Sequence, residues 1–315
     1  MLRPTVTART AALRRSFPVS AALDPYVERY WAARWDRTGQ PPFRSEVLSH
    51  PSVNLSLESG TEPRWGVRLP AALLHGAVGR RFVVDLVGVG RVVAVKFRPG
   101  GFTAMTGMPV PRDDVRRVEA APWLGQGRDG VPAELLELLD LGTDEEVAAG
   151  LDAALLPAAR EPGATYDQLR GLLARMVTDR SLVRVEQVAA AASVSPRTLQ
   201  RLFARYVGVG PKAVLARYRL QDAVSTIDDG GVGHGVDGLA ALAASLGWFD
   251  HAHFCRDFRD LVGTTPSAYL ARARAEEQGP RTGATGRPRP AGLSAARRGP
   301  SAPSAQRSRR RSGTP

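Results

Sequence analysis

The stretch VSPRTLQRLFARYVGVGP, at residues 194–211, carries the signals for a short helix, its beginning and its end. Ser195 is a favoured residue just before a helix, and Pro196 suits the first helical position because its missing N–H would have no partner there. Gly208 predicts the end of this helix, and Pro211 predicts the beginning of the next one. The stretch therefore predicts a short helix followed almost directly by another.

The predicted short helix has one apolar face and several basic residues elsewhere. The apolar face has spacings of three and four and consists of Leu199, Leu202, Phe203 and Tyr206. The polar positions are Arg197, Thr198, Gln200, Arg201 and Arg205. A small-residue helix is expected just upstream, over residues 185–192, and only a short turn separates the two. A helix, a tight turn and an amphipathic helix with a basic face form the layout of a helix-turn-helix motif.

The stretch FDHAHFCRDFRDLVGTTP, at residues 249–266, repeats the same pattern, with Asp250 in the place of Ser195. The pairs that recur 55 residues apart are Arg201 and Arg256, Phe203 and Phe258, Gly208 and Gly263, and Pro211 and Pro266. Upstream, Val188 and Ala189 match Leu242 and Ala243 at a spacing of 54, so the second turn should be one residue longer. Any two amphipathic helices with Gly or Pro at their ends would share part of this pattern. Recurrence of caps, apolar positions and stops together predicts a structural repeat.

These motifs resemble the DNA-binding part of the AraC family of transcription regulators, over roughly residues 166–273. The resemblance rests on V-x-x-x-A-S-V-S-P-R-T-L-x-R-L-F at 188–203, GVGPK at 208–212, YRLQDAV at 218–224 and LAASLGWFDHAHFCRDFRDLVGTTPSAYL at 242–270. It implies two helix-turn-helix motifs joined by a long helix, each placing one helix in a major groove. The implied DNA-binding domain spans residues 166–275.

The resemblance also implies which side chains face DNA. By position, the candidates in the first motif are Arg197, Thr198, Gln200 and Arg201, and Arg205 adds to the same basic helix. Those in the second motif are His251, Ala252, His253, Cys255 and Arg256. Ala252 and Cys255 offer little hydrogen bonding, so the second helix is expected to read fewer bases.

Residues 17–160 predict a small β-rich domain that ends in helices, so the expected fold class is α+β. The expected strands are PSVNLSL, RFVVDLV and RVVAVKF, and the expected helices are VPAELLELLD and DEEVAAGLDAALL. RPGG, at 98–101, is expected to be a turn between a strand and a helix. Trp31 and Trp35 lie four residues apart, which favours one face of a helix. SFPVSAALDPYVERYWAARWD and KFRPGGF are similar to a poorly characterised N-terminal domain often joined to such regulators, a resemblance that implies no known ligand. We expect residues 17–160 to act as a sensor or in dimerisation.

Composition limits the class of protein. The chain has 315 residues, room for two domains, and a net charge of +12. Nine Arg and no acidic residue lie in residues 279–315, whereas residues 181–275 hold 11 basic and 8 acidic residues. We expect residues 279–315 and 1–16 to be disordered. No apolar run is long enough for a membrane helix, and the single cysteine, Cys255, suits a reducing cytoplasm.

The sequence thus predicts a cytoplasmic, sequence-specific transcription regulator that binds double-stranded DNA and has neither a catalytic site nor a cofactor. A small-molecule effector, a homodimer and a contact with RNA polymerase are further partners that this interpretation allows. His251, His253 and Cys255 could suggest zinc, but His253 points to another helix face and a fourth ligand is missing. Two alternatives stay open: an enzyme of the DNA-repair type, with its chemistry in the N-terminal domain, and an adaptor that binds protein through the helical repeat.

Overall fold

The computed structural model of the chain describes residues 13–47, 51–77, 82–111, 115–118, 133–233 and 235–278. The tail at 279–315 and residues 1–12, both expected to be disordered, lie outside these ranges. The expectation of disorder is wrong for residues 13–16. They belong to strand β1 (Leu13–Phe17), whose partners run from Leu13 opposite Arg34 to Phe17 opposite Tyr30.

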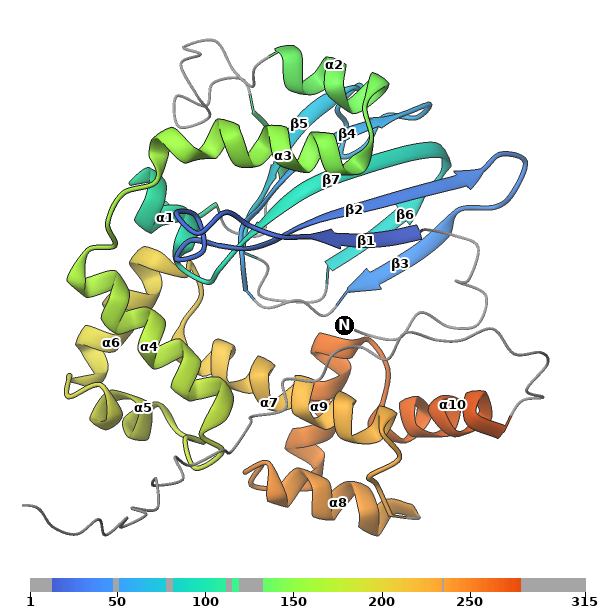
Figure 1. Cartoon of the computed structure of the whole chain (residues 1–315). Helices are drawn as coiled ribbons and strands as arrows, with labels where there is room; N and C mark the ends of the chain where they lie inside the picture. Colours follow the sequence, from blue (N-terminus) through green and yellow to red (C-terminus); the bar gives the residue numbers. More distant parts are fainter. Residues whose placement is uncertain are drawn as a thin grey trace, which may run out of the picture. The chain divides into compact units, whose positions relative to one another are not determined.

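The N-terminal half is built around an antiparallel sheet of six strands, in the order β1-β2-β7-β4-β5-β8 (Figure 1). Beyond β1, its strands are β2 (Val27–Arg37), β4 (Asn54–Gly60), β5 (Ala71–His75), β7 (Gly88–Phe97) and β8 (Val115–Arg117). A separate two-stranded antiparallel sheet, the β3–β6 pair, is formed by β3 (Phe43–Val47) and β6 (Phe82–Leu86). The three stretches predicted as strands overlap β4, β6 and β7, so these predictions are confirmed, although β4 continues to Gly60 and β7 already begins at Gly88.

The two faces of the six-stranded sheet are covered differently. One face packs against α2 (Ala133–Leu141) and α3 (Asp144–Leu155), the two predicted helices, and its core includes Leu57, Val93, Leu139 and Leu151. The other face packs against the β3–β6 pair through a cluster of Trp35, Leu86, Val92 and Ala94. The RPGG turn joins β7 to the short helix α1 (Gly101–Thr106), as predicted, and α3 continues into a 3-10 turn, η2 (Leu156–Ala158).

The expectation that Trp31 and Trp35 lie on a helix is wrong. Both belong to β2, and both contribute to the cluster beneath the β3–β6 pair. Side chains alternate along a strand, so residues four apart share a face in a strand as well as in a helix. Their spacing was therefore compatible with both structures.

A set of charged side chains is buried on the sheet face that carries Trp35. The Glu58 side chain is 2% exposed, and its carboxylate lies 2.8 Å from Arg64 Nη1 and 3.3 Å from His75 Nε2. Ser56 Oγ donates to Glu58 Oε1 at 2.7 Å and lies 2.8 Å from His75 Nε2. Burial alone would raise the pKa of Glu58, but the hydrogen bond with His75 and the charge of Arg64 outweigh it and lower that pKa. The buried charge is thereby compensated within the domain.

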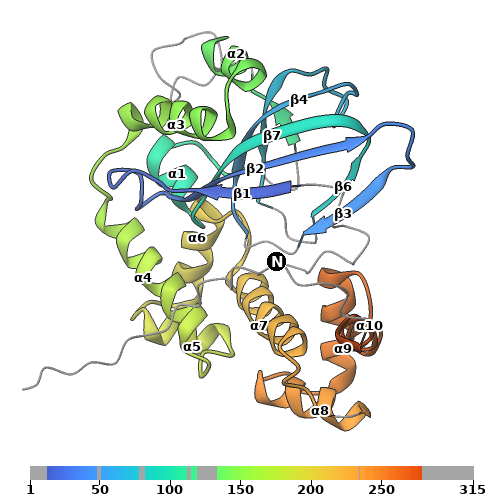
Figure 2. The same ribbon diagram turned by 45° about the vertical axis from the view of Figure 1, so that its right-hand side comes forward.

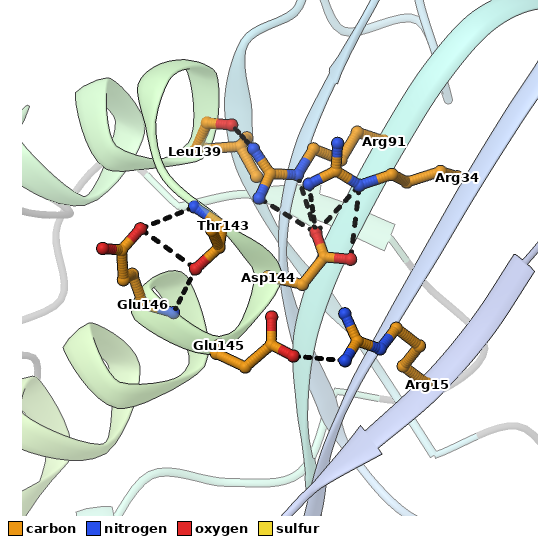
Figure 3. A network of polar contacts seen from close by, with 8 residues as sticks. All are labelled: Arg15, Arg34, Arg91, Leu139, Thr143, Asp144, Glu145 and Glu146. Atoms are coloured by element: carbon orange, nitrogen blue, oxygen red, sulfur yellow. Dashed lines mark hydrogen bonds and ion pairs between the residues drawn. The ribbon is translucent and has the colours of Figure 1, made fainter.

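A second polar network ties α3 to the other face of the sheet (Figure 3). Asp144, in the first turn of α3, receives hydrogen bonds from Arg34 Nη2 at 2.7 Å and from Arg91 Nε at 3.0 Å. Arg34 lies on β2 and Arg91 on β7, and Arg91 also donates to the carbonyl of Leu139. One carboxylate thus links two strands with the beginning of a helix.

The C-terminal half is helical, and its elements match the predicted double motif (Figure 2). The helices are α4 (Ala164–Thr178), α5 (Val185–Ala191), α6 (Pro196–Tyr206), α7 (Pro211–Asp228), α8 (Gly235–Ser245), α9 (His251–Val262) and α10 (Pro266–Gln278). One core lies around α4, α5 and α6, and another lies around α8, α9 and α10. Helix α7 contributes to both, so it joins the two motifs as expected.

Three tyrosines connect the N-terminal strands with the helices. Tyr26, just before β2, stacks on Tyr166 of α4 at 5.7 Å between ring centroids, and Tyr166 stacks on Tyr206 of α6 at 6.1 Å. Tyr166 also donates a hydrogen bond to the carbonyl of Pro25 at 2.7 Å.

Within the described ranges, no helix has the length and apolar character needed to cross a membrane.

Candidate nucleic-acid interface

The first motif presents a basic surface because its apolar side chains are held in the core. Ser195 caps α6 and accepts a hydrogen bond from the N–H of Thr198 at 3.1 Å, and Pro196 occupies the first turn. Leu199 and Phe203 are fully buried. Four of the five predicted DNA-facing residues of this helix are exposed: Arg197, Gln200, Arg201 and Arg205.

Thr198, the fifth, lies differently. Its side chain is only partly exposed, and its hydroxyl lies 3.0 Å from the Ser195 hydroxyl. The hydroxyl is therefore already engaged with the cap. Among these residues, the three arginines and Gln200 present the most accessible donors, and Arg is the side chain that most often recognises guanine in a major groove.

The second motif repeats this construction with different polar chemistry. Asp250 caps α9 and accepts a hydrogen bond from the N–H of His253 at 2.6 Å. Phe254 and Phe258 are fully buried, which leaves Arg256 exposed on the opposite side. Helix α9 ends at Gly263, whose φ of 87° is the left-handed conformation that glycine adopts most readily. This capping glycine confirms the helix end predicted from the repeat.

The two histidines of α9 are half-buried and have neighbours on their own helix. His253 Nε2 lies 3.2 Å from Asp257 Oδ2, and the ring of His251 lies 3.6–3.7 Å from Cys255 Sγ. Burial raises the pKa of the Cys255 thiol, which favours its protonated form over the thiolate that binds metals. In the part of the chain that the structure describes, no three His, Cys, Asp or Glu side chains group in a way that could hold a metal ion.

The turn before α9 is fixed by contacts that were not predicted from the sequence. Trp248 is 5% exposed, and its indole N–H donates to Asp257 Oδ2 at 2.9 Å. The guanidinium of Arg219, on α7, lies 4.0 Å from the Trp248 ring centroid, and its Nε donates to the carbonyl of Leu246 at 2.6 Å. The Trp in the turn was a visible signal, but its partners lie 9 and 29 residues away and could not be identified from spacing. These contacts orient α9 relative to α7.

Replacing Arg219 with alanine should lower the free energy of unfolding by about 2 kcal/mol, because a cation–π contact and a charged hydrogen bond are both lost. Urea unfolding followed by circular dichroism measures this change. Arg256→Ala is the matched control, since its exposed side chain should leave stability within about 0.5 kcal/mol of the wild type. Equal stability of the two variants would contradict the structural role of Arg219.

Comparisons with known families match two separate parts of the chain. Residues 188–272 match a family described as a helix-turn-helix domain, and residues 15–113 match a domain of unknown function, DUF6597. The regulatory protein PocR of Salmonella typhimurium is 32% identical over 87 residues, which is 28% of this chain and 27% of PocR. YidL, an uncharacterized HTH-type transcriptional regulator of Escherichia coli, is 35% identical over 86 residues, 27% of each chain. The chain therefore spans about a quarter of the length of these curated relatives.

Several solved structures are also similar. A probable AraC family transcriptional regulator from Rhodopseudomonas palustris shares 31% identity, with a TM-score of 0.30, over 34% of this chain and 97% of its own. The DNA-binding domain of AdpA, solved in complex with a target DNA, shares 25% identity, with a TM-score of 0.30, over 36% and 97%. ToxT from Vibrio cholerae shares 9% identity, with a TM-score of 0.42, over 83% and 98%.

The matched range 188–272 begins within α5 and ends within α10, so it includes both turns and both basic helices. The two helix-turn-helix motifs have caps, buried phenylalanines and terminating glycines at corresponding places. Residues 188–272 therefore match a helix-turn-helix domain family, in agreement with the double motif predicted from the resemblance, and residues 15–113 match a separate domain family of unknown function.

Proposed function

We propose that this protein is a sequence-specific DNA-binding transcription regulator that reads two successive major grooves with α6 and α9. The observation that carries the proposal is the duplicated motif, in which each second helix buries its phenylalanines and exposes arginine. We assign the base and backbone contacts to Arg197, Thr198, Gln200, Arg201, Arg205, His251, His253 and Arg256.

The length of α7 supports this arrangement. Its 18 residues correspond to about 27 Å at 1.5 Å per residue. Successive major grooves on one side of B-DNA lie about 34 Å apart, so a connector of this length suits two reading helices that extend beyond its ends. The domain at residues 17–160, in this proposal, senses a ligand or joins two copies of the chain in the cytoplasm. A contact with RNA polymerase then follows DNA binding.

The alternative, an enzyme of the DNA-repair type, would need a reactive group in the N-terminal half. Its usual nucleophile is a cysteine, and the chain's single cysteine is Cys255, on α9. Burial raises the pKa of that thiol, which opposes nucleophilic chemistry. We therefore propose that the protein has no enzymatic activity.

Arg201→Ala should weaken binding to the operator by about 1–3 kcal/mol and relax base preference at particular positions, because a bidentate arginine contact would be lost. The operator is first selected from random duplex DNA with the full-length protein, and affinities are then measured by fluorescence anisotropy at fixed salt. Arg68→Ala is the charge-matched control, since Arg68 is exposed between β4 and β5. Unchanged affinity and base preference in Arg201→Ala would refute the assignment of α6 as a reading helix.

A further inference from the structure

The two turns of the double motif differ by one residue, and the backbone shows which residue is extra. In the first turn, Ser193 has a φ of 54° and the next N–H, that of Val194, donates to the carbonyl of Ala189 at 3.0 Å. In the second turn, Gly247 has a φ of 81° and the N–H of Trp248 donates to Ala243 at 2.9 Å. Val194 and Trp248 are therefore structurally equivalent.

The helix caps then identify the insertion. Ser195, the cap of α6, follows Val194 directly, whereas Phe249 lies between Trp248 and Asp250, the cap of α9. Phe249 has no counterpart in the first motif. The prediction that the second turn is one residue longer is confirmed, and the additional residue is a large aromatic side chain.

Phe249 has no packing role within the described fold. A hydrophobic residue just before a helix cap often packs onto the first turns of the helix. Here Trp248 makes that contact, because its ring lies 5.1 Å from that of Phe254, and it is 5% exposed. Phe249 is 95% exposed. Isolated exposed apolar residues are common on protein surfaces, so exposure alone would indicate nothing.

The exposed ring of Phe249 lies next to the end of α9 that the proposed function places in a major groove. It precedes the N-terminus of α9, and the N-terminal residues of the second helix of such a motif contact base edges in the major groove. Ala252, in the first turn of α9, is also exposed and apolar. The thymine C5-methyl is the apolar group that a major groove offers, and phenylalanine is one of the side chains that contact it.

We propose that Phe249 is a specificity-determining residue that packs against a thymine methyl group in the part of the operator read by α9. This inference rests on the proposed function. It assigns an apolar contact to a helix whose hydrogen-bonding residues are few, and it explains how the second motif can select bases with less hydrogen bonding than the first.

The test uses the full-length protein and its selected operator. Each thymine in the α9 half-site is replaced in turn by deoxyuridine, which removes the methyl group and keeps base pairing. One replacement should weaken wild-type binding by roughly fourfold, the effect of one buried methyl-sized group. Phe249→Ala should lose affinity by at least this factor and become insensitive to that replacement, whereas Phe249→Leu should stay sensitive to it.

Two results would overturn the inference. If Phe249→Ala weakens binding by the same factor on thymine and deoxyuridine operators at every position, the ring contacts the sugar–phosphate backbone. If binding is unchanged and only transcription is altered, the ring contacts a protein. Thermal melts should be unchanged in Phe249→Ala, so folding does not confound the result. Loss of base preference in Arg201→Ala tests the proposed function independently, so the two proposals can fail separately.

Discussion

Phe258→Ala is expected to lower the free energy of unfolding by about 3–5 kcal/mol, the range found when a buried phenylalanine is truncated. Phe258 is fully buried, with ring centroids at 5.5 Å from Phe254 and 5.8 Å from Tyr269. The ring therefore joins α9 to α10, and its removal leaves a cavity between them. Urea unfolding of the full-length protein, followed by circular dichroism, measures the loss.

Phe249→Ala provides a matched control for this variant. It removes the same side chain nine residues earlier, but Phe249 is 95% exposed, so stability should change by no more than about 0.5 kcal/mol. Phe203→Ala, at the corresponding buried position of α6, should resemble Phe258→Ala. If Phe249→Ala were the more destabilising variant, the assignment of Phe258 as buried and Phe249 as exposed would be wrong.

Asp144→Asn is expected to lower the free energy of unfolding by about 3 kcal/mol, because Arg91 would keep a buried positive charge without its partner. The side chains of Asp144 and Arg91 are 6% and 10% exposed. Glu145→Gln, one residue further along α3, is the control. Its ion pair with Arg15 is about half exposed on both sides, so its loss should matter by less than about 1 kcal/mol.

The same variant should change how stability depends on pH. Burial opposes ionisation of Asp144, but hydrogen bonds from Arg34 and Arg91 outweigh it and lower its pKa. In the unfolded chain the pKa of an aspartate is about 3.9. As the pH falls, the unfolded chain therefore binds the proton before the folded chain does. The Asp144 contribution is fully present above about pH 5 and is lost as the pH falls through the lowered pKa. Asp144→Asn should remove this part of the acid sensitivity, and an unchanged pH profile would contradict it.

The double motif could be predicted from the sequence because its signals are local. Ser195, Asp250, Gly208 and Gly263 act on backbone groups within a few residues of themselves, and the apolar spacing of each helix is visible in the sequence. Trp31 and Trp35 were misassigned because a spacing of four residues fits a helix and a strand equally. The spacing of apolar residues therefore identifies a helix or a strand only where it fits one of the two repeat periods, about 3.6 or 2 residues, and not the other.

The polar contacts that position the elements could not be predicted in the same way. Arg219 meets Trp248 only after α7 and the second motif have packed together, and Asp144 meets Arg34 and Arg91 only once three elements converge. Neither pairing has a fixed spacing along the chain. The exposure of Phe249 could not be predicted either, because it follows from the packing of Trp248 against Phe254 in the position beside it.

The buried charges around Glu58 have a consequence for how the strands align. In the observed pairing of β4 with β5, Asn54 lies opposite His75 and Ser56 opposite Leu73. A shift by two residues, about 7 Å, would keep every side chain on its own face, so apolar burial would hardly distinguish it from the native pairing. The shift that places Ser56 opposite Ala71 would, however, carry Ser56 and Glu58 away from His75 and leave a carboxylate inside the domain without one of its partners, at a cost of several kcal/mol. These ionisable groups thus discriminate against misaligned sheets that hydrophobicity alone would tolerate.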